Sequence, residues 1–266
     1  MYKILILAVV QGIAEFLPIS SSGHLVMLGA LIHEFSDSVR ELSESPTAEI
    51  ILHAGTLGSI VVVFWRRLLT LLTRDRRVLP LLLIGTLPAA IVGLTVRSQF
   101  PALLVNPILV GPMLLITGGM LIVLGRLRVR EGTYLAMNWR TAIWIGCFQA
   151  FAILPGISRS GSTILGGRLL GLNKEDSVTF SFLLAIPAIL GASLVAVNDL
   201  WQQLSAGKPL QYTVTELAIG AVASCLVGIV ALLWLIGWNR QDRLHWFAWW
   251  CIPVGIWASF HFSGTP

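Results

Sequence analysis

Residues Gln11–Gly23 read QGIAEFLPISSSG, and residues Gln149–Gly161 read QAFAILPGISRSG. The two stretches align without a gap at an offset of 138 residues (Gln149 against Gln11), and Gln, Ala, Ile, two serines and the closing Gly recur at equivalent positions. Each copy is an apolar run that is broken by proline and then by a serine-rich turn containing glycine. In a hydrophobic chain, a duplicated interrupted helix indicates where a binding site lies.

The composition of the chain indicates a membrane protein. Of its 266 residues, 56% are hydrophobic and only 12% are charged, which is too little charge to cover a soluble domain. The net charge of +5 comes mostly from loop arginines without a nucleic-acid-binding motif, so we expect no nucleic-acid partner. Three cysteines without CxxC spacing predict neither a disulfide framework nor a zinc site. We therefore predict an all-α polytopic membrane protein, a single membrane domain (1–266) surrounded by membrane lipids.

The chain contains apolar runs of two lengths, with a pair of short runs ahead of each group of three long runs. Six runs approach the roughly 20 residues that a bilayer-spanning helix requires. These predicted full spans are about 49–65, 78–97, 107–125, 175–198, 213–238 and 243–262. Shorter apolar pieces flank each serine turn, at about 3–17 and 21–33 and at about 140–154 and 160–171. These pieces are too short to cross, so each pair predicts a re-entrant helical hairpin.

The arginines of the loops predict the orientation of the spans. They gather in the segments 66–77, 126–140 and 240–243, which we expect on the cytoplasmic side. The segment 34–49 is acidic and suits the outer side. Three full spans, an odd number, separate the two hairpins, so the hairpins enter the membrane from opposite sides. This predicts inverted repeats, about 1–125 and 139–262, whose hairpin tips meet near the middle of the membrane.

The first copy carries groups that can react. Gln11 and Glu15 are four residues apart and share one helix face, and a carboxylate inside a membrane segment is functional by default. A structural hydrogen bond from Glu15 to a neighbouring helix is the alternative. Ordinary helix capping would explain one serine of the triplet Ser20, Ser21 and Ser22, but hardly all three. His24 follows Gly23, and beside a buried carboxylate it is a candidate for proton transfer, although a lone histidine is more often a packed residue.

The second copy carries a group that can hold an anion. Arg159 stands where the first copy has Ser21, between Ser158 and Ser160 and ahead of Thr163. A guanidinium with serine hydroxyls at a helix N-terminus suits a phosphate or pyrophosphate. An ion pair between Arg159 and Glu15 is the alternative, and it is compatible with phosphate binding. Ser21 or a neighbour could then attack phosphorus, with a divalent cation, Mg²⁺ or Ca²⁺, held by Glu15 and phosphate oxygens.

At these residues the chain closely resembles the undecaprenyl pyrophosphate phosphatase family of integral membrane enzymes. The first signature of that family stands here as Gln11–His24, and its second, PGxSRSxxT, stands as Pro155–Thr163. Both motifs are long and rare, and the length and span layout agree, so the resemblance covers essentially the whole chain.

The resemblance implies a function and a set of roles. It implies metal-dependent hydrolysis of a C55 polyprenyl pyrophosphate to the monophosphate and inorganic phosphate, in the bacterial cytoplasmic (inner) membrane, with a site open to the outer face. It makes Ser21 the nucleophile, Glu15 and His24 the acid, base or metal-associated residues, and Arg159 the phosphate-binding residue. Many members carry Glu where this chain has Gln11, which leaves Glu15 as the principal metal ligand. Whether a phosphoserine forms or Ser21 orients a water stays open.

Two further questions stay open at the level of sequence. Inverted repeats with broken helices are also the architecture of secondary transporters, so a transporter or flippase of an anionic or phosphorylated solute or lipid is the alternative function. The pairs Gly118-Gly119 and Gly166-Gly167 permit close helix contacts, either within one chain or between the subunits of a homodimer.

Overall fold

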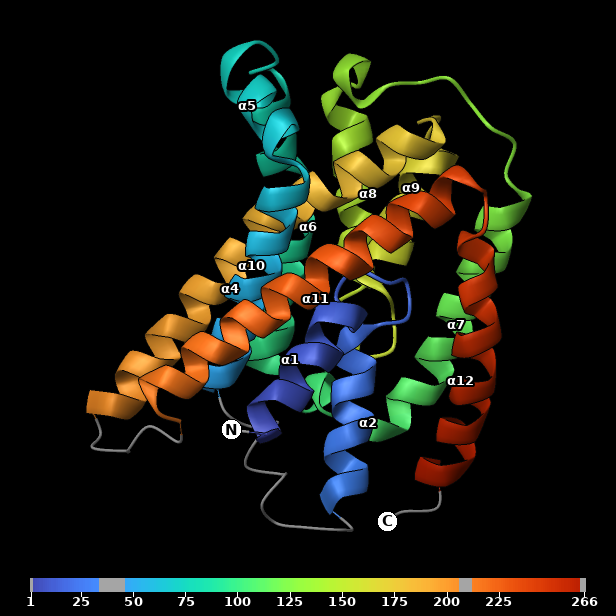
Figure 1. Cartoon of the computed structure of the whole chain (residues 1–266). Helices are drawn as coiled ribbons and strands as arrows, with labels where there is room; N and C mark the ends of the chain where they lie inside the picture. The colour runs from blue at the N-terminus through green and yellow to red at the C-terminus, as the bar shows by residue number, and fades with distance from the viewer. Residues whose placement is uncertain (1, 34–45, 206–211, 264–266) are drawn as a thin grey trace.

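The computed structural model of the protein describes residues 2–33, 46–205 and 212–263 (Figure 1). Across these ranges the chain forms α-helices joined by turns and short 3-10 helices, and no β-strand occurs within them. Most of the segment predicted to face outward, up to residue 45, lies outside the described residues. The α-helices are α1 (Tyr2–Ala14), α2 (Ser21–His33), α4 (Pro46–Val63), α5 (Trp65–Thr73), α6 (Val78–Gln99), α7 (Pro107–Arg126), α8 (Trp139–Phe151), α9 (Arg159–Leu169), α10 (Lys174–Ser205), α11 (Val214–Arg240) and α12 (Ala248–Ser263). The 3-10 helices are η1 (Pro101–Leu104), η2 (Tyr134–Ala136) and η3 (Leu244–Phe247).

The long helices make this a multi-pass membrane protein. Within the described residues, α6, α7, α10 and α11 are each long and apolar enough to cross a bilayer. A fifth crossing results if α4 and α5 form one span, although the pair bends by 74° at the break next to Phe64. Five predicted spans coincide with these helices: 49–65, 78–97, 107–125, 175–198 and 213–238. The sixth, 243–262, is divided between η3 and the 16-residue α12, so a count of six spans stays a prediction.

The outer surface of the helices is apolar, as contact with lipid requires. Leu194 and Trp201 on α10 are 71% exposed, and Trp249 and Phe260 on α12 are 79% exposed. A water-facing surface with so many large exposed apolar side chains would be prone to association. Prolines inside α6, α7, α10 and α12 fit the same environment, because neighbouring helices can satisfy the backbone groups that a proline frees.

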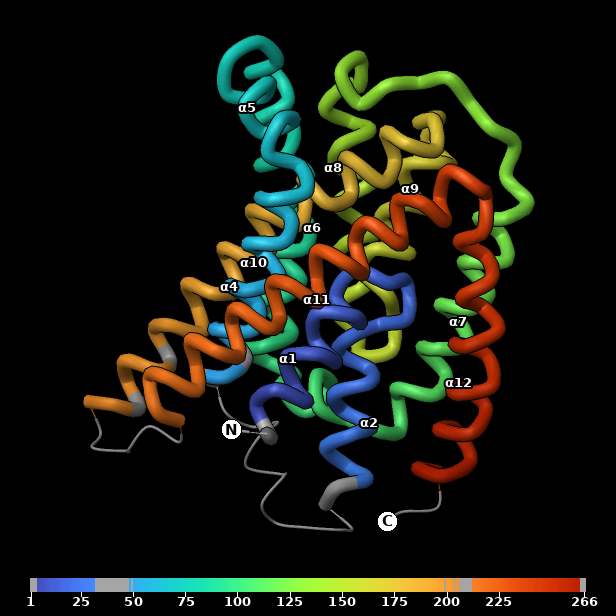
Figure 2. The backbone as a smooth tube through the Cα atoms, viewed as in Figure 1, coloured from blue at the N-terminus to red at the C-terminus, as the bar shows by residue number. Residues whose placement is uncertain are grey.

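The two short helical pairs meet in the interior of the molecule. In Figures 1 and 2, α1 and α2 lie in the lower half and α8 and α9 in the upper half, and the turns that join each pair come together at the centre. A hydrogen bond crosses between the turns, because the backbone N–H of Gly156 donates to Ser20 Oγ at 3.1 Å. Both helix breaks fall at the same place in the duplicated sequence, since α2 begins at Ser21 and α9 begins at Arg159.

Helices of one half of the chain pack against helices of the other half. α1 lies on α11 and α8 lies on α6, while α4 contacts α10 and α7 contacts α12. Gly118 of α7 allows one of these approaches, because it lies against Ile252 of α12. Within the second half, Gly166 and Gly167 of α9 lie against Phe148 of α8 and Ser177 of α10. These three contacts are within the chain, whereas Gly119 faces open space. A contact between subunits at Gly119 therefore stays a prediction.

Candidate active site

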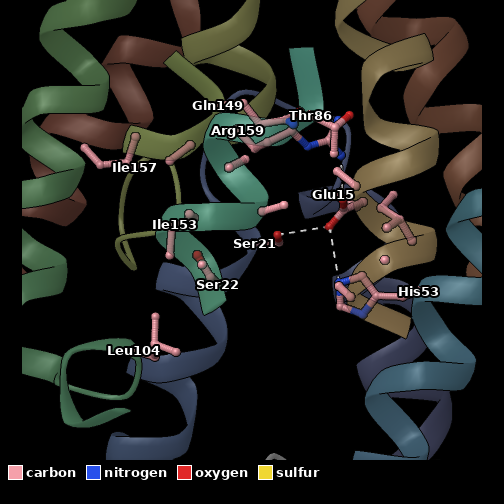
Figure 3. Close-up of a pocket in the computed structure, with 18 of the residues that line it drawn as sticks. Glu15, Ser21, Ser22, His53, Thr86, Leu104, Gln149, Ile153, Ile157 and Arg159 are labelled. Carbon is pink, nitrogen blue, oxygen red and sulfur yellow. Dashed lines mark hydrogen bonds and ion pairs between the residues drawn. The ribbon is translucent and has the colours of Figure 1, made fainter. Parts of the chain in front are cut away.

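A cavity of about 510 Å³ lies where the two turns meet α4, α6 and α10 (Figure 3). Polar side chains from both copies of the repeat line it, together with one residue of α4: Glu15, Ser20, Ser21, Ser22, His53, Gln149, Ser158 and Arg159. The walls contributed by α6 and α10 are mostly small and apolar, and include Ala89, Ala90, Gly93, Ala188, Gly191 and Ala192. Thr86 and Arg97 of α6 are the polar residues in these walls. The cavity therefore offers charged and hydroxyl groups at the turns and a largely apolar surface along two long helices.

Glu15 is the centre of the polar group. It is only 8% exposed, and its two carboxylate oxygens have different partners. Arg159 Nη2 donates to Oε1 at 2.6 Å, so the ion pair considered from the sequence forms across the interface of the two hairpins. Gln11 Nε2 donates to Oε2 at 3.1 Å, and Ser21 Oγ donates to Oε2 at 3.2 Å. Four predicted site residues, namely Glu15, Arg159, Gln11 and Ser21, thus form one hydrogen-bonded network centred on the buried carboxylate.

Ser20 and Ser158 are the helix caps of the two copies. Ser20 Oγ accepts from the backbone N–H of Gly23 at 3.2 Å, and Ser158 Oγ accepts from that of Gly161 at 3.1 Å. Both hydroxyls are buried and hold the turns in place. Capping therefore uses one serine in each copy, which leaves Ser21 and Ser22 facing the cavity.

The backbone at Ser20 is held in an uncommon conformation. Its φ angle is +69°, in the left-handed region that favours glycine, whereas its equivalent Ser158 has φ −76°. Hydrogen bonds offset the energetic cost of this conformation. The Ser20 hydroxyl accepts from two backbone N–H groups, and its carbonyl accepts from His24. Strain of this kind is found where the surrounding structure fixes a functional turn.

His24 does not lie with Glu15 and Ser21. Its Nδ1 is 2.8 Å from the Ser20 carbonyl, and its Nε2 accepts from the indole N–H of Trp250 at 3.0 Å. A carbonyl only accepts and an indole N–H only donates, so the ring is the neutral tautomer with its hydrogen on Nδ1. The ring also stacks on Trp250, with their planes 13° apart. The described lining of the cavity does not include His24, so a proton-transfer role for it stays a prediction.

His53 on α4 takes the place beside Glu15 that we expected for His24. Its Nε2 is 3.9 Å from Glu15 Oε2, its side chain is 26% exposed, and it lines the cavity. The sequence contains the signal that would have found it, because an imidazole in the first predicted span is as unusual as the carboxylate.

Three predicted phosphate-binding residues support the turns and do not line the cavity. Thr163 Oγ1 donates to the Arg159 carbonyl at 2.8 Å, and Ser160 pairs with Ser158 at 3.3 Å between the hydroxyl oxygens. Gly23 is buried between the hairpins, where an added Cβ would lie 2.8 Å from Gly156 Cα. In the structure these residues fix the position of Arg159 and of the two helix starts.

The variant Gly23→Ala tests this close approach. We expect it to lower the stability of the protein in detergent by about 1–3 kcal/mol, because the new methyl group meets the backbone of Gly156. The matched control is Gly161→Ala at the equivalent position, where the nearest atom is Pro18 Cβ at 3.3 Å and a small shift relieves the contact. Thermal unfolding of both variants measures the difference, and equal losses would contradict this account of the hairpin contact.

The residues of the cavity fit a divalent cation only in a limited way. Among the described residues, no group of three or more His, Cys, Asp and Glu side chains is close enough to hold a metal ion. Glu15 is the single carboxylate among the described residues that line the cavity, and hydrogen-bond donors already occupy both of its oxygens. Magnesium is often bound by one or two carboxylates together with the phosphates of a substrate. The arrangement suits a cation shared between Glu15 and a bound phosphate.

The sequence is similar to that of a family of known proteins over nearly its whole length. Residues 4–257 match the family described as bacitracin resistance protein BacA. An undecaprenyl-diphosphatase of Rhodopirellula baltica is 63% identical over 254 residues, which cover 96% of this chain and 95% of the relative. Proteins of the same name from Alkaliphilus metalliredigens and Desulfatibacillum aliphaticivorans are 36% and 34% identical, with 96% of both chains covered for the first and 95% of both for the second.

Proposed function

The chain belongs to the bacitracin resistance protein BacA family, and on this premise we propose that it is an undecaprenyl-diphosphatase. The reaction is hydrolysis of undecaprenyl pyrophosphate to the monophosphate and inorganic phosphate. The observation that carries this proposal is the Ser21–Glu15–Arg159 network, which faces a cavity with apolar walls. A polyprenyl pyrophosphate has an anionic head that matches the polar network and an apolar tail that matches the apolar walls.

We propose roles for the three residues that agree with their geometry. Ser21 Oγ–H already donates to Glu15 Oε2, so the carboxylate is placed to accept the hydroxyl proton when the oxygen attacks phosphorus, or when Ser21 orients an attacking water. Arg159 holds Glu15 with Nη2, while its Nη1 is buried and has no hydrogen-bond partner among the described residues, and we propose that Nη1 donates to a phosphoryl oxygen. Attack forms a new P–O bond, to Ser21 or to water, and breaks the anhydride P–O bond, so the lipid monophosphate leaves. If Ser21 attacks, water then hydrolyses the phosphoserine. One water is consumed for each inorganic phosphate released.

The starts of two helices support the same role. α2 begins at Ser21 and α9 begins at Arg159, so backbone N–H groups without helical partners lie at both reactive positions. Such groups favour a phosphate at the N-terminus of a helix. We propose that Ser20, Ser22 and Ser158, which line the cavity, lie close to the bound phosphate, and that Ser160 supports Ser158.

A divalent cation completes the proposal. Mg²⁺ or Ca²⁺ bound between Glu15 and the pyrophosphate oxygens would neutralise developing charge during the reaction. Because Gln11 is a neutral amide that donates to Glu15, it adds no charge to such a site.

We also propose that the two halves of the chain, about 1–125 and 139–262, are inverted repeats. Two observations support this arrangement: the hairpin turns meet, and helices of each half pack against helices of the other half. The cytoplasmic side is then that of α5 and its arginines, in the bacterial cytoplasmic (inner) membrane, and the cavity opens to the outer face. In that setting the enzyme recycles the lipid carrier of cell-wall synthesis. We also propose that two copies of the chain form a homodimer.

Cysteine labelling tests the orientation. We expect a cysteine at Ser98, exposed at the end of α6, to react with an impermeant maleimide added to intact cells. A cysteine at Thr73, exposed at the end of α5, should react only after the membrane is opened. The unsubstituted chain corrects for Cys147, Cys225 and Cys251. The opposite pattern would reverse the proposed topology.

Release of phosphate tests the function. Purified protein in detergent should release inorganic phosphate from undecaprenyl pyrophosphate when Mg²⁺ or Ca²⁺ is supplied, and a chelator should stop the release. Release that continues unchanged with the chelator would remove the cation from the proposal and keep the activity. Without any release, the transporter alternative, which the names of the relatives do not favour, would have to be tested by uptake of anions into liposomes.

A further inference from the structure

Gln149 on α8 is a buried amide whose polar atoms have no hydrogen-bond partner. Its side chain is 3% exposed and lines the cavity, and neither Nε2 nor Oε1 is bonded within the described structure. The same holds for Nη1 of Arg159, which lines the same cavity. Figure 3 shows Gln149 and Arg159 at the same end of the cavity, away from Leu104.

The duplicated sequence explains why this amide is free. Gln11 is its equivalent in the first copy, and Gln11 donates to Glu15, which is four residues later and directly follows the end of α1. The residue four positions after Gln149 is Ile153, whose side chain can accept no hydrogen bond. The second copy therefore keeps the glutamine and lacks the carboxylate, so the amide of Gln149 remains available to a ligand.

Such an arrangement is unfavourable unless something binds there. The large majority of buried polar groups in native proteins have a hydrogen-bond partner, because an orphaned buried donor or acceptor loses its hydration without replacement. Two orphaned groups that line one cavity indicate that the partner comes from the ligand. A neutral amide beside a guanidinium offers a donor and an acceptor together, which suits a phosphoryl group that carries both charged and protonated oxygens at neutral pH.

We propose that Gln149 is a substrate-binding residue that holds the terminal phosphoryl group of the pyrophosphate together with Arg159 Nη1. Its Nε2–H donates to a charged phosphoryl oxygen, and its Oε1 accepts from a protonated one. This inference rests on the proposed function and adds to it a residue of the second copy. The terminal phosphoryl group becomes the inorganic phosphate, so Gln149 also contacts this product before it is released.

The test compares Gln149→Leu and Gln149→Glu with Cys147→Ala, an exposed position on the same helix. The probe is inorganic pyrophosphate, and its dissociation constant is measured in detergent by calorimetry. We expect Gln149→Leu to weaken binding by about 10- to 100-fold, as loss of a hydrogen bond to a charged group does, and to raise KM for the lipid substrate. Gln149→Glu should weaken binding further because its carboxylate repels phosphate, and Cys147→Ala should bind as the wild type does.

Thermal unfolding without ligand separates binding from a structural role. Because the amide has no partner to lose, Gln149→Leu should unfold at the wild-type temperature or above it. A lower unfolding temperature with unchanged pyrophosphate affinity would overturn the inference and make Gln149 a structural residue. If Gln149→Leu binds pyrophosphate and turns over the lipid as the wild type does, the inference fails while the proposed function stands. If the wild type neither binds pyrophosphate nor releases phosphate from the lipid, both fail.

Discussion

Arg159→Ala is expected to lower kcat by about 10³- to 10⁵-fold, the range seen when an arginine that stabilises phosphoryl transfer is removed. The side chain does two things at once, since Nη2 holds Glu15 at 2.6 Å while Nη1 is left for the phosphate. It also lies over the ring of Phe182, with its guanidinium carbon 5.9 Å from the ring centre. Arg159→Lys should lose nearly as much, because an ammonium cannot reproduce the planar fork or the stacking.

Thermal unfolding separates the loss of activity in Arg159→Ala from its loss of stability. Arg159→Ala leaves Glu15 buried without its cation, which we expect to reduce stability by roughly 3–5 kcal/mol. The double variant Glu15→Gln/Arg159→Ala removes the lone charge, so its unfolding temperature should recover while phosphate release stays absent. Arg140→Ala, on the exposed surface of α8, is the matched control. Wild-type turnover by Arg159→Ala would refute the assignment of phosphate binding.

Ser21→Ala is the second variant with a large expected effect. If the Ser21 oxygen attacks phosphorus, its removal should lower kcat at least about a thousandfold, as loss of a catalytic nucleophile does. Folding should be preserved, because the helix cap is provided by Ser20 and the hydroxyl of Ser21 bonds only to Glu15 among the described contacts.

The control for Ser21→Ala is Ser162→Ala on α9. The hydroxyl of Ser162 donates to the Phe148 carbonyl at 2.6 Å and does not line the cavity, so its loss should change phosphate release only slightly. A rate for Ser21→Ala within about tenfold of the wild type would assign the attack to water. A phosphorylated peptide containing Ser21, trapped by rapid quenching and seen by mass spectrometry, would instead establish the covalent route.

The local breaks of the chain could be predicted from sequence because their causes are local. Proline followed by a serine that can cap the next helix ends α1 and α8 and starts α2 and α9, and the offset between the copies places both breaks. Opposite charges in the two buried turns also made the Glu15–Arg159 pair foreseeable. The long apolar runs gave α6, α7, α10 and α11 because hydropathy measures the burial of a helix in lipid directly.

The features that sequence reasoning missed depend on residues far apart in the chain. His24 turns toward Trp250, which lies 226 positions away, and no local pattern indicates that partner. The 74° bend between α4 and α5 lies at Phe64, where the predicted span 49–65 ends. The segment after it, predicted as a loop with Arg66 and Arg67, is instead the helix α5. Gln149 was visible as part of the repeat, but its lack of a partner became evident only when the cavity and Ile153 were placed around it.

The reciprocal contacts at the hairpin tips bear on how such a chain can originate. Gly23 lies against Gly156 and Gly161 lies against Pro18, and the offset of the repeat converts one contact into the other. Two identical half-length polypeptides could form both contacts, but they would carry the same residue at each pair of equivalent positions. Here Glu15 is matched by Ile153 and Ser21 by Arg159. Two copies of a half-length chain would have to differ from one another before their tips could carry these residues, so a split version of the protein needs two unlike halves.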